Sequence, residues 1–248
     1  MKLTAIIICR SKQEKGLKRA LTSVRFSDEI LVEEHPKITD YAFVRNQALE
    51  KANGEWVIFV DADEVISEDL SSEIKTQISK LKTKYINGYY LKRQDWFLGK
   101  WLKYGETTRV KLIRLARKDA GEWIRPVHET WKVSGRIEEL KNPILHYSHQ
   151  SAGEMLEKLD KYTEMETEYR LGNLGRKVRP RHTSRSDLGI LIEMVLLPLG
   201  KFIRNYFWRL GVLDGMPGFI NAVMMSWHSF LVRAKFLGKK QRAKSNEQ

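Results

Sequence analysis

The sequence predicts an α/β fold in which a doubly wound, Rossmann-like sheet of parallel strands carries an antiparallel extension. Two observations indicate the parallel part. Strands alternate with helices over the first ~80 residues, and the strands are apolar along their whole length, as in sheets that are buried on both faces. A third observation indicates the extension, because from Gly88 onward short strands follow one another with only turns between them.

Each element of the parallel part has its own signal. The run LTAIIIC is the first strand, and apolar side chains at helical spacing then mark residues 14–24 as a helix. A second helix, residues 40–52, is stopped by Asn53-Gly54. The strand WVIFV follows, and Ser67 caps the next helix. In order, the predicted strands are residues 3–9, 30–32 and 56–60, and the predicted helices are residues 14–24, 40–52 and 68–81.

The rest of the chain is divided by its composition. The segments GYYLKRQDWF, TRVKLIRLAR and ETWKVSG form the antiparallel extension, which we expect to cover a ligand site. An amphipathic helix and a basic linker, residues 176–185, come next. The sequence therefore predicts a sheet domain over residues 1–150, a helix with its linker over residues 151–185, and a helical region over residues 186–248.

The net charge of +13 is concentrated in the tail. Residues 170–248 hold 15 Lys and Arg against 4 Asp and Glu, so +11 of the charge lies there, and the first two-thirds of the chain is nearly neutral. Cys9 is the one cysteine, which excludes a disulfide framework and favours a reducing compartment.

The apolar residues of the tail decide between nucleic acid and an anionic membrane surface as its partner. LGILIEMVLLPLGKFIRNYFWRL and FINAVMMSWHSFLVRAKFL are too short or too interrupted to span a bilayer, and they lack the polar faces of a nucleic-acid reader. We therefore expect amphipathic, membrane-associated helices on an anionic surface, and no nucleic acid. Packing of these helices on the sheet domain, or on a second copy in a homodimer, is the alternative.

Carboxylates gather where the predicted parallel strands end. Asp61 and Asp63 follow the third strand, and Glu33 and Glu34 end the second. Ligands of doubly wound sheets bind beyond the carboxyl ends of the strands. An Asp-x-Asp pair suits a hard divalent cation, Mg²⁺ or Mn²⁺, whose other positions are filled by phosphate oxygens and water. The chain has neither a P-loop nor a G-x-G-x-x-G motif, so those phosphate-binding classes are not favoured.

Five segments together resemble glycosyltransferase family 2, and in particular its bacterial branch of lipopolysaccharide core glucosyltransferases. They are, in order, AIIICRSKQEKGLKRALTSV, DEILV, RNQALEKANGEWVIFVDADE, PVHETWKVSG and PILHYSHQS. The segment LGVLDGMPGFINA is similar to the C-terminal part of that branch, so the resemblance covers about residues 3–235. It implies a GT-A fold, a nucleotide-diphosphate sugar donor and inversion at the anomeric carbon.

The resemblance also implies roles for individual residues. Asp61 and Asp63 would hold the metal and the donor diphosphate, and Arg45 and Asn46 would lie near the donor. Glu129 would be the base, with His128 beside it. Chemistry supports a carboxylate there, because direct displacement needs a base on the acceptor hydroxyl. The alternative for this pair is a satisfied polar pair at a strand end.

Two further donor contacts are expected outside these motifs. Arg114 lies on a strand of the extension, where it could meet phosphate, although a solvated strand face is the default for a strand arginine. In the family an acidic turn, a helix and another strand usually follow the second strand, whereas here EEHPKITDYAFVRN leaves a short connection. Glu33 or Glu34 would then replace the usual nucleotide-contacting aspartate.

The sequence thus predicts a metal-dependent, inverting glycosyltransferase on the cytoplasmic face of the inner membrane. It would move one sugar from a nucleotide sugar to a lipid-linked or lipopolysaccharide-core acceptor. The chain has no Q-x-x-R-W segment, which favours a single transfer over polymerisation. A nucleotidyltransferase and a non-catalytic membrane scaffold remain as rivals at this point.

Overall fold

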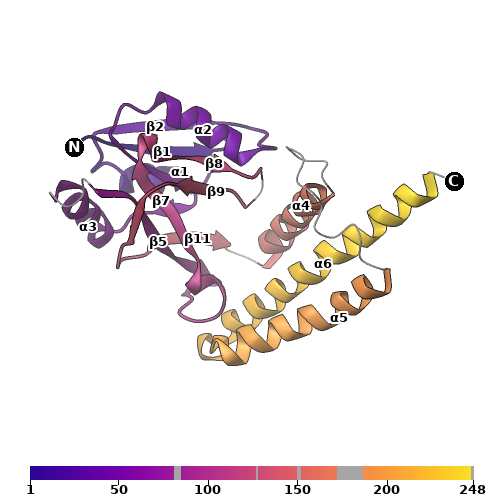
Figure 1. The fold of residues 1–248 in the computed structure, drawn as a ribbon. Coiled ribbons are helices and arrows are strands. Elements are labelled where there is room, and N and C mark those ends of the chain that lie inside the picture. The colour runs from indigo at the N-terminus through magenta and orange to yellow at the C-terminus, as the bar shows by residue number, and fades with distance from the viewer. Residues whose placement is uncertain (81–84, 127, 150–151, 172–186, 247–248) are drawn as a thin grey trace. The chain divides into compact units, whose positions relative to one another are not determined.

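The computed structural model describes residues 1–80, 85–126, 128–149, 152–171 and 187–246. The chain forms two compact units (Figure 1). The sheet unit consists of residues 1–96 and 107–148, and the helical unit consists of residues 97–106 and 149–248. The basic linker predicted at residues 176–185 lies outside the described residues.

Three parallel strands form the part of the sheet unit that the sequence predicts in most detail. β1 (Leu3–Cys9) pairs in parallel with β2 (Glu29–Glu34) on one side and with β3 (Trp56–Asp61) on the other. The parallel α/β prediction is therefore confirmed. The carboxyl ends of all three strands lie at the same edge of the sheet, as a ligand site of this fold class requires.

Helices cover both faces of these strands. α1 (Leu17–Ser23) and α3 (Glu68–Ser79) pack on one face. α2 (Tyr41–Lys51) packs on the other, together with a hairpin of β8 (Gly121–Ile124) and β9 (Thr130–Val133). Because successive strand residues point to opposite faces, β1 contributes apolar side chains to both layers and is buried along its whole length.

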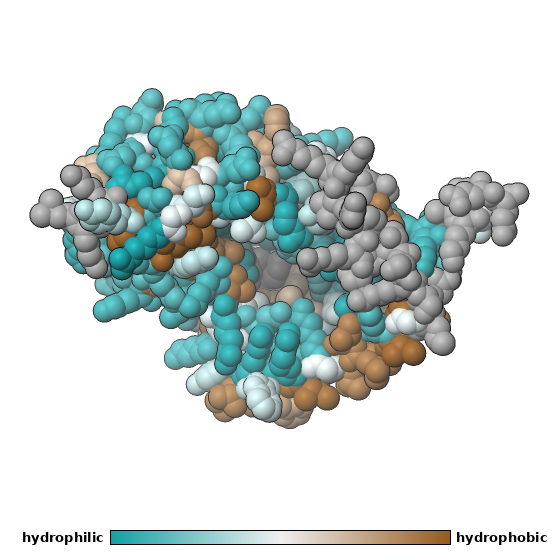
Figure 2. All heavy atoms as spheres, in the orientation of Figure 1, coloured by the Kyte–Doolittle hydropathy of each residue, from teal (hydrophilic) through white to brown (hydrophobic). Residues whose placement is uncertain are grey.

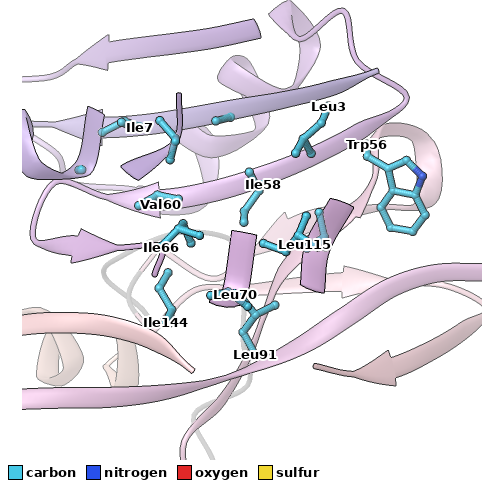
Figure 3. Close-up of a cluster of buried hydrophobic side chains, with 14 of the residues drawn as sticks. Leu3, Ile7, Trp56, Ile58, Val60, Ile66, Leu70, Leu91, Leu115 and Ile144 are labelled. Carbon is cyan, nitrogen blue, oxygen red and sulfur yellow. The ribbon is translucent and has the colours of Figure 1, made fainter. Parts of the chain in front are cut away.

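The cluster on the α1 and α3 face joins side chains from many elements (Figure 3). Ile7 and Ile58 come from the parallel strands, Leu70 comes from α3, and Leu115 comes from the antiparallel part. Burial of each such side chain contributes about 1.5–3 kcal/mol. This core fixes the end of β3, and thereby the acids that follow it.

The antiparallel extension continues the same sheet. β7 (Lys111–Arg117) pairs antiparallel with β3, and β5 (Ile86–Phe97) pairs antiparallel with β7. β11 (Ile144–His149), β4 (Glu64–Val65) and β10 (Arg136–Glu139) complete it, and its main path runs β2-β1-β3-β7-β5-β11-β4. The predicted extension is therefore confirmed, and β11 returns beside the turn that follows β3.

The first helix is shorter than the sequence predicts. The expected range was residues 14–24, but α1 begins at Leu17. The side chain of Glu14 accepts the backbone N–H of Arg10 at 2.9 Å, so that the residues before α1 form turns. Gly16 then passes close to the loop after β3, a contact that a longer regular helix would not make.

The helical unit contains three long helices. They are α4 (Ala152–Arg170), α5 (Asp187–Ile203) and α6 (Met216–Asn246). A π-helical turn, Arg204–Trp208, and a 3₁₀ turn, Gly211–Asp214, join α5 to α6. The joint is fixed by Asp214, a buried side chain that accepts the backbone N–H groups of Lys103 and Tyr104 at 2.9–3.2 Å.

The helical unit leaves many large apolar side chains exposed. Figure 2 shows brown side chains gathered along the lower part of the molecule, where α5 and the turn after it lie in Figure 1. Among the helices of the described residues, none is long and apolar enough to cross a membrane.

Candidate active site

The acids Glu33 and Asp61 occupy the same register position at the ends of their strands. Ile8 in β1 lies beside Glu33 of β2 and beside Asp61 of β3. Aligned residues of parallel strands share a face, so both side chains leave the sheet on the face that α2 covers, from backbones about 9–10 Å apart as two strand spacings require. The sheet register thus brings together two of the predicted donor-binding residues.

Asp61 is held by two buried arginines. Arg45 Nη2 donates to Oδ1 and Arg114 Nη2 donates to Oδ2, each at 2.6 Å. Burial alone would raise the pKa of Asp61, but the two guanidinium groups hold it well below its usual range. Asp61 is therefore ionised at neutral pH, and its position is fixed from both sides.

Arg114 was placed by default on a solvated strand face, and that placement is wrong. Its side chain is buried, because β7 pairs with β3 and points Arg114 at the end of that strand. It also donates to Glu64 at 3.2 Å. Arg114 is therefore a buried cation beside the acids, and its donor-binding role stays a prediction.

Arg45 also connects Asp61 to Glu129. Its Nη2 and Nε atoms donate to Glu129 Oε1 at 3.0 and 3.2 Å. The guanidinium lies 4.6 Å from the ring centre of Trp123, which supports it from the far side. Helix α2 therefore places one cation between the two acids to which the sequence gives different roles.

His128 adopts a left-handed backbone conformation beside Glu129. Its φ of 51° is uncommon for a residue other than glycine. The bend occurs where the chain passes from the β8 strand to β9, and it turns the backbone immediately before Glu129. His128 is thus placed by strain at the candidate base, as active-site segments often are.

Glu64 stabilises the turn that carries the Asp-x-Asp pair. Its side chain is buried, and its Oε2 accepts the backbone N–H of Asp61 at 3.0 Å. Burial and the charge of Asp61 raise the pKa of Glu64, although Arg114 opposes this. The sequence shows the third acid of VDADE, but only the structure shows that it faces inward.

Asp63 meets a histidine from the other end of the sheet unit. His146 Nε2 lies 3.5 Å from Asp63 Oδ2, and His146 Nδ1 lies 2.7 Å from Asp95 Oδ1. Burial would lower the pKa of His146, but the two carboxylates raise it to about 9. The imidazole is therefore charged at neutral pH and joins two acids, one of them the buried Asp95 that the sequence did not single out.

Gly16 sets the position of the Asp-x-Asp loop. A Cβ atom at this position would lie 2.2 Å from the carbonyl oxygen of Ala62, the residue between Asp61 and Asp63. No side chain can be accommodated at that distance without moving backbone. The loop before α1 and the loop after β3 therefore require a glycine where they touch.

Two predicted donor contacts are engaged within the protein. Asn46 exchanges hydrogen bonds with the backbone of Trp123, at 2.9 and 2.8 Å, and so fixes the β8 hairpin to α2. Glu33 accepts from Lys51 Nζ at 2.7 and 2.8 Å. The polar groups of Asn46 and Glu33 are therefore already used in these bonds, and their donor-binding roles stay predictions.

The residues present fit a divalent cation held mainly by Asp63. No cluster of three or more His, Cys, Asp or Glu side chains with metal-site geometry occurs in the part of the chain that the structure describes. A cation that keeps several waters and phosphate oxygens needs only one or two protein carboxylates. The two side chains are about equally exposed, at 30% for Asp61 and 32% for Asp63, but both oxygens of Asp61 carry an arginine donor, whereas the contact of Asp63 with His146 is made by Oδ2.

In sequence the chain is similar to glycosyltransferases. Residues 6–127 match the family model "Glycosyl transferase family 2". An uncharacterized glycosyltransferase of Rickettsia typhi is 23% identical over 266 residues, which cover 95% of this chain and 87% of that protein. The lipopolysaccharide core biosynthesis glycosyltransferase LpsC of Rhizobium meliloti is 24% identical over 202 residues, which cover 79% of this chain and 68% of that protein.

A solved structure supports the fold. The mannosyltransferase PcManGT from Pyrobaculum calidifontis, in complex with GDP-Man and Mn²⁺, matches with a TM-score of 0.52 and 10% identity. The match covers 96% of this chain and 88% of that chain. At this identity the likeness concerns the fold alone.

Proposed function

Because the chain belongs to glycosyltransferase family 2, we propose that it transfers one sugar, with inversion, from a nucleotide-diphosphate sugar to a lipid-linked or lipopolysaccharide-core acceptor. The family makes it a nucleotide-sugar transferase of the GT-A fold, so the nucleotidyltransferase and scaffold alternatives lose their basis. The acceptor class rests on the similarity to LpsC, and the proposed place of action is the cytoplasmic face of the inner membrane.

One observation carries the mechanism. Asp61, Arg45 and Glu129 form a continuous chain of charged contacts of 2.6–3.0 Å at the carboxyl end of β3. The chain joins the part of the site that would bind the donor to the part that would activate the acceptor. A rigid link between these two parts keeps the reacting groups in the geometry that a direct displacement needs.

Asp63 would hold the divalent cation, Mg²⁺ or Mn²⁺. When bound, the cation neutralises charge on the diphosphate leaving group. His146 lies 3.5 Å from Asp63 and is itself held by Asp95 at 2.7 Å, so these two residues fix the position of the Asp63 side chain. Arg114 and Arg45, both buried, keep Asp61 ionised beside it.

Glu129 would be the base. Arg45 holds its Oε1, and among the described residues no partner is found for Oε2, which is then available to an acceptor hydroxyl. The hydroxyl proton passes to Glu129 as the acceptor oxygen bonds to the anomeric carbon. The bond from that carbon to the diphosphate oxygen breaks on the opposite face, and the nucleoside diphosphate leaves with its electron pair, so the configuration is inverted.

The substitution Glu129→Gln tests this assignment. We expect it to lower the transfer rate by roughly 10²- to 10⁴-fold, because a general base contributes that much, while donor binding is retained. Transfer is followed as nucleoside diphosphate released from a panel of nucleotide sugars with Mg²⁺ or Mn²⁺, and donor affinity is measured by calorimetry. Glu138→Gln, at an exposed ion pair on β10, is the matched control.

Two results would contradict the proposal. Release of pyrophosphate in place of nucleoside diphosphate would indicate nucleotidyl transfer. An equal loss of donor affinity and of rate in Glu129→Gln would place this residue in the donor pocket.

A further inference from the structure

We infer that the exposed apolar surface of the helical unit is a docking face for an anionic lipid membrane. This docking face comprises one side of α5, the turn after it and the start of α6, and among its most exposed members are Leu196, Leu199, Phe207, Trp208, Leu213 and Met216. The inference concerns the helical unit alone and does not depend on the sugar-transfer chemistry.

The exposed residues form continuous stripes along both helices. On α6, exposed apolar side chains recur every three or four residues, at Met216, Phe219, Val223 and Trp227. The opposite side of the same helix is buried in the helical unit, at positions such as Ala222, Val232 and Phe236. A helix of a water-soluble unit should have one apolar stripe, and this one has two, so the second needs another partner.

The turn between α5 and α6 presents the largest rings to solvent. Trp208 is 83% exposed and Phe207 is 56% exposed. The ring of Phe207 packs at 5.0 Å on Tyr206, which in turn contacts Phe219 at 5.5 Å, so the rings form one rigid aromatic projection. Tryptophan and tyrosine are favoured at membrane interfaces, where one part of the ring is apolar and the other is wet.

Cations surround this projection. Among the described residues, Lys100 and Lys103 bond to Asp214 of the turn, through Nζ and the backbone N–H, and Lys201, Arg204 and Arg209 come from the end of α5 and the π-helical turn after it. The two acids nearby are neutralised inside the unit, since Asp214 is buried against backbone N–H groups and Glu106 accepts from Lys201 at 3.2 Å and from Asn205 at 2.9 Å. The rim of the docking face is therefore net positive, complementary to anionic headgroups.

The same rim argues against a second copy of the chain as the occupant. A two-fold dimer would place this surface against itself. The net positive rims of the two copies, with the half-exposed Arg204 and the exposed Lys103, would then meet, and like charges across an interface are unfavourable. A membrane that offers both apolar chains and negative headgroups satisfies the two parts of the surface together.

Binding of the full-length chain to vesicles of phosphatidylcholine with about 30% phosphatidylglycerol tests the inference. We expect the double substitution Leu196→Ser/Trp208→Ser to weaken binding at least ~10-fold, because each fully buried side chain contributes about that factor or more. Lys103→Gln/Arg204→Gln should weaken binding to these vesicles and have little effect with pure phosphatidylcholine. About 1 M salt should weaken but not abolish binding of the unsubstituted chain, because screening removes only the electrostatic part.

The sheet unit supplies matched controls. Tyr85 is 76% exposed in that unit, and Tyr85→Ser should leave vesicle binding unchanged. Lys18→Gln, on the exposed side of α1, is the control for charge. Circular dichroism and melting curves show whether each variant remains folded.

Three results would overturn the inference. The first is a full-length chain that ignores anionic vesicles. The second is equal binding by Leu196→Ser/Trp208→Ser and by Tyr85→Ser. The third is a dimer in solution that the double substitution converts to a monomer, which would make this surface a contact between copies.

Discussion

The sheet unit and the helical unit differ most clearly in where they place their apolar side chains. Of 22 large apolar residues that are exposed in the described chain, 16 lie between Leu191 and Trp227. Those of the sheet unit, such as Phe43 and Tyr85, are few and separated in sequence. Single exposed apolar residues are ordinary on a soluble domain, whereas a continuous stripe indicates a partner.

The two units also differ in where their ion pairs lie, since the sheet unit buries some of them and the helical unit keeps most of them at the surface. In the sheet unit, Arg45 and Arg114 are buried against carboxylates. In the helical unit, ion pairs such as that of Lys239 with Glu164 lie at the surface. Buried pairs are costly to break and surface pairs are nearly neutral. The comparison teaches that substitutions of charge should change stability mainly in the sheet unit, and that substitutions of exposed apolar residues should change lipid binding mainly in the helical unit.

The largest expected effect is that of Asp63→Asn on catalysis. Loss of the carboxylate that would hold the cation should lower transfer by ~10³-fold or more, since the ion's charge stabilisation amounts to several kcal/mol. Vesicle binding should be unchanged, because the docking face lies in the other unit. Turnover across a range of Mg²⁺ and Mn²⁺ concentrations, measured beside vesicle sedimentation, checks both statements.

Asp69→Asn is the matched control, since that acid is exposed in the first turn of α3. Wild-type turnover of Asp63→Asn at every metal concentration would show that the metal assignment is wrong. Loss of vesicle binding in the same variant would break the separation between the two units.

The next largest effect is on stability. Arg45→Leu leaves Asp61 and Glu129 without their shared cation in a buried place, so we expect the free energy of unfolding to fall by about 3–5 kcal/mol. Arg136→Leu removes one partner of an exposed pair with Glu138 and should cost no more than about 1 kcal/mol. Urea unfolding of the two variants measures both changes in the free energy of unfolding. Equal, small decreases would show that Arg45 does not stabilise the fold through its ion pairs.

Most of the fold follows from local patterns. The first strand has the predicted bounds, residues 3–9, because an apolar β-branched run can hardly form anything else there. The pairing order is less local. β7 enters beside β3 and brings Arg114 inward, and a strand with a basic residue at every third position (Lys111, Arg114 and Arg117) gives no sign of which cation will be buried.

The site is predictable in part for the same reason. Asp61 and Asp63 stand out because acids after a buried strand are costly without a partner. Asp95 does not, and nothing in the sequence pairs it with His146, since the two come together only when β5 and β11 lie side by side in the sheet. Contacts that depend on the register between strands far apart in the chain cannot be predicted from the sequence of either segment alone.

The smallest expected effect is on the free energy of unfolding, and it is measured by substituting one carboxylate in each unit. Glu29 accepts from Thr4 at 2.6 Å and from the backbone and side-chain N–H groups of Asn53 at 2.8 and 2.6 Å. These bonds lower the pKa of Glu29 to about 2. In the helical unit, Lys239 and Lys235 lower the pKa of Glu164 by ion pairing at the surface.

The sign for Glu29 follows from its lowered pKa. The stabilisation is fully present above the unfolded pKa of about 4.3, and it is lost as the pH falls through the folded value of about 2. Since the group is partly solvated, we expect Glu29→Gln to lower the free energy of unfolding by on the order of 1 kcal/mol at pH 7, with the difference from wild type vanishing near pH 2. Glu164→Gln should cost less, roughly 0.5 kcal/mol, and about 1 M salt should remove even that, because its partners are ions. Urea unfolding at two pH values and two salt concentrations separates the cases, since hydrogen bonds from neutral donors are insensitive to screening. If the loss of stability in Glu29→Gln depended on salt, nearby charges and not neutral hydrogen-bond donors would set the pKa of Glu29. The electrostatic difference between the two units would then be limited to the buried ion pairs of the candidate active site.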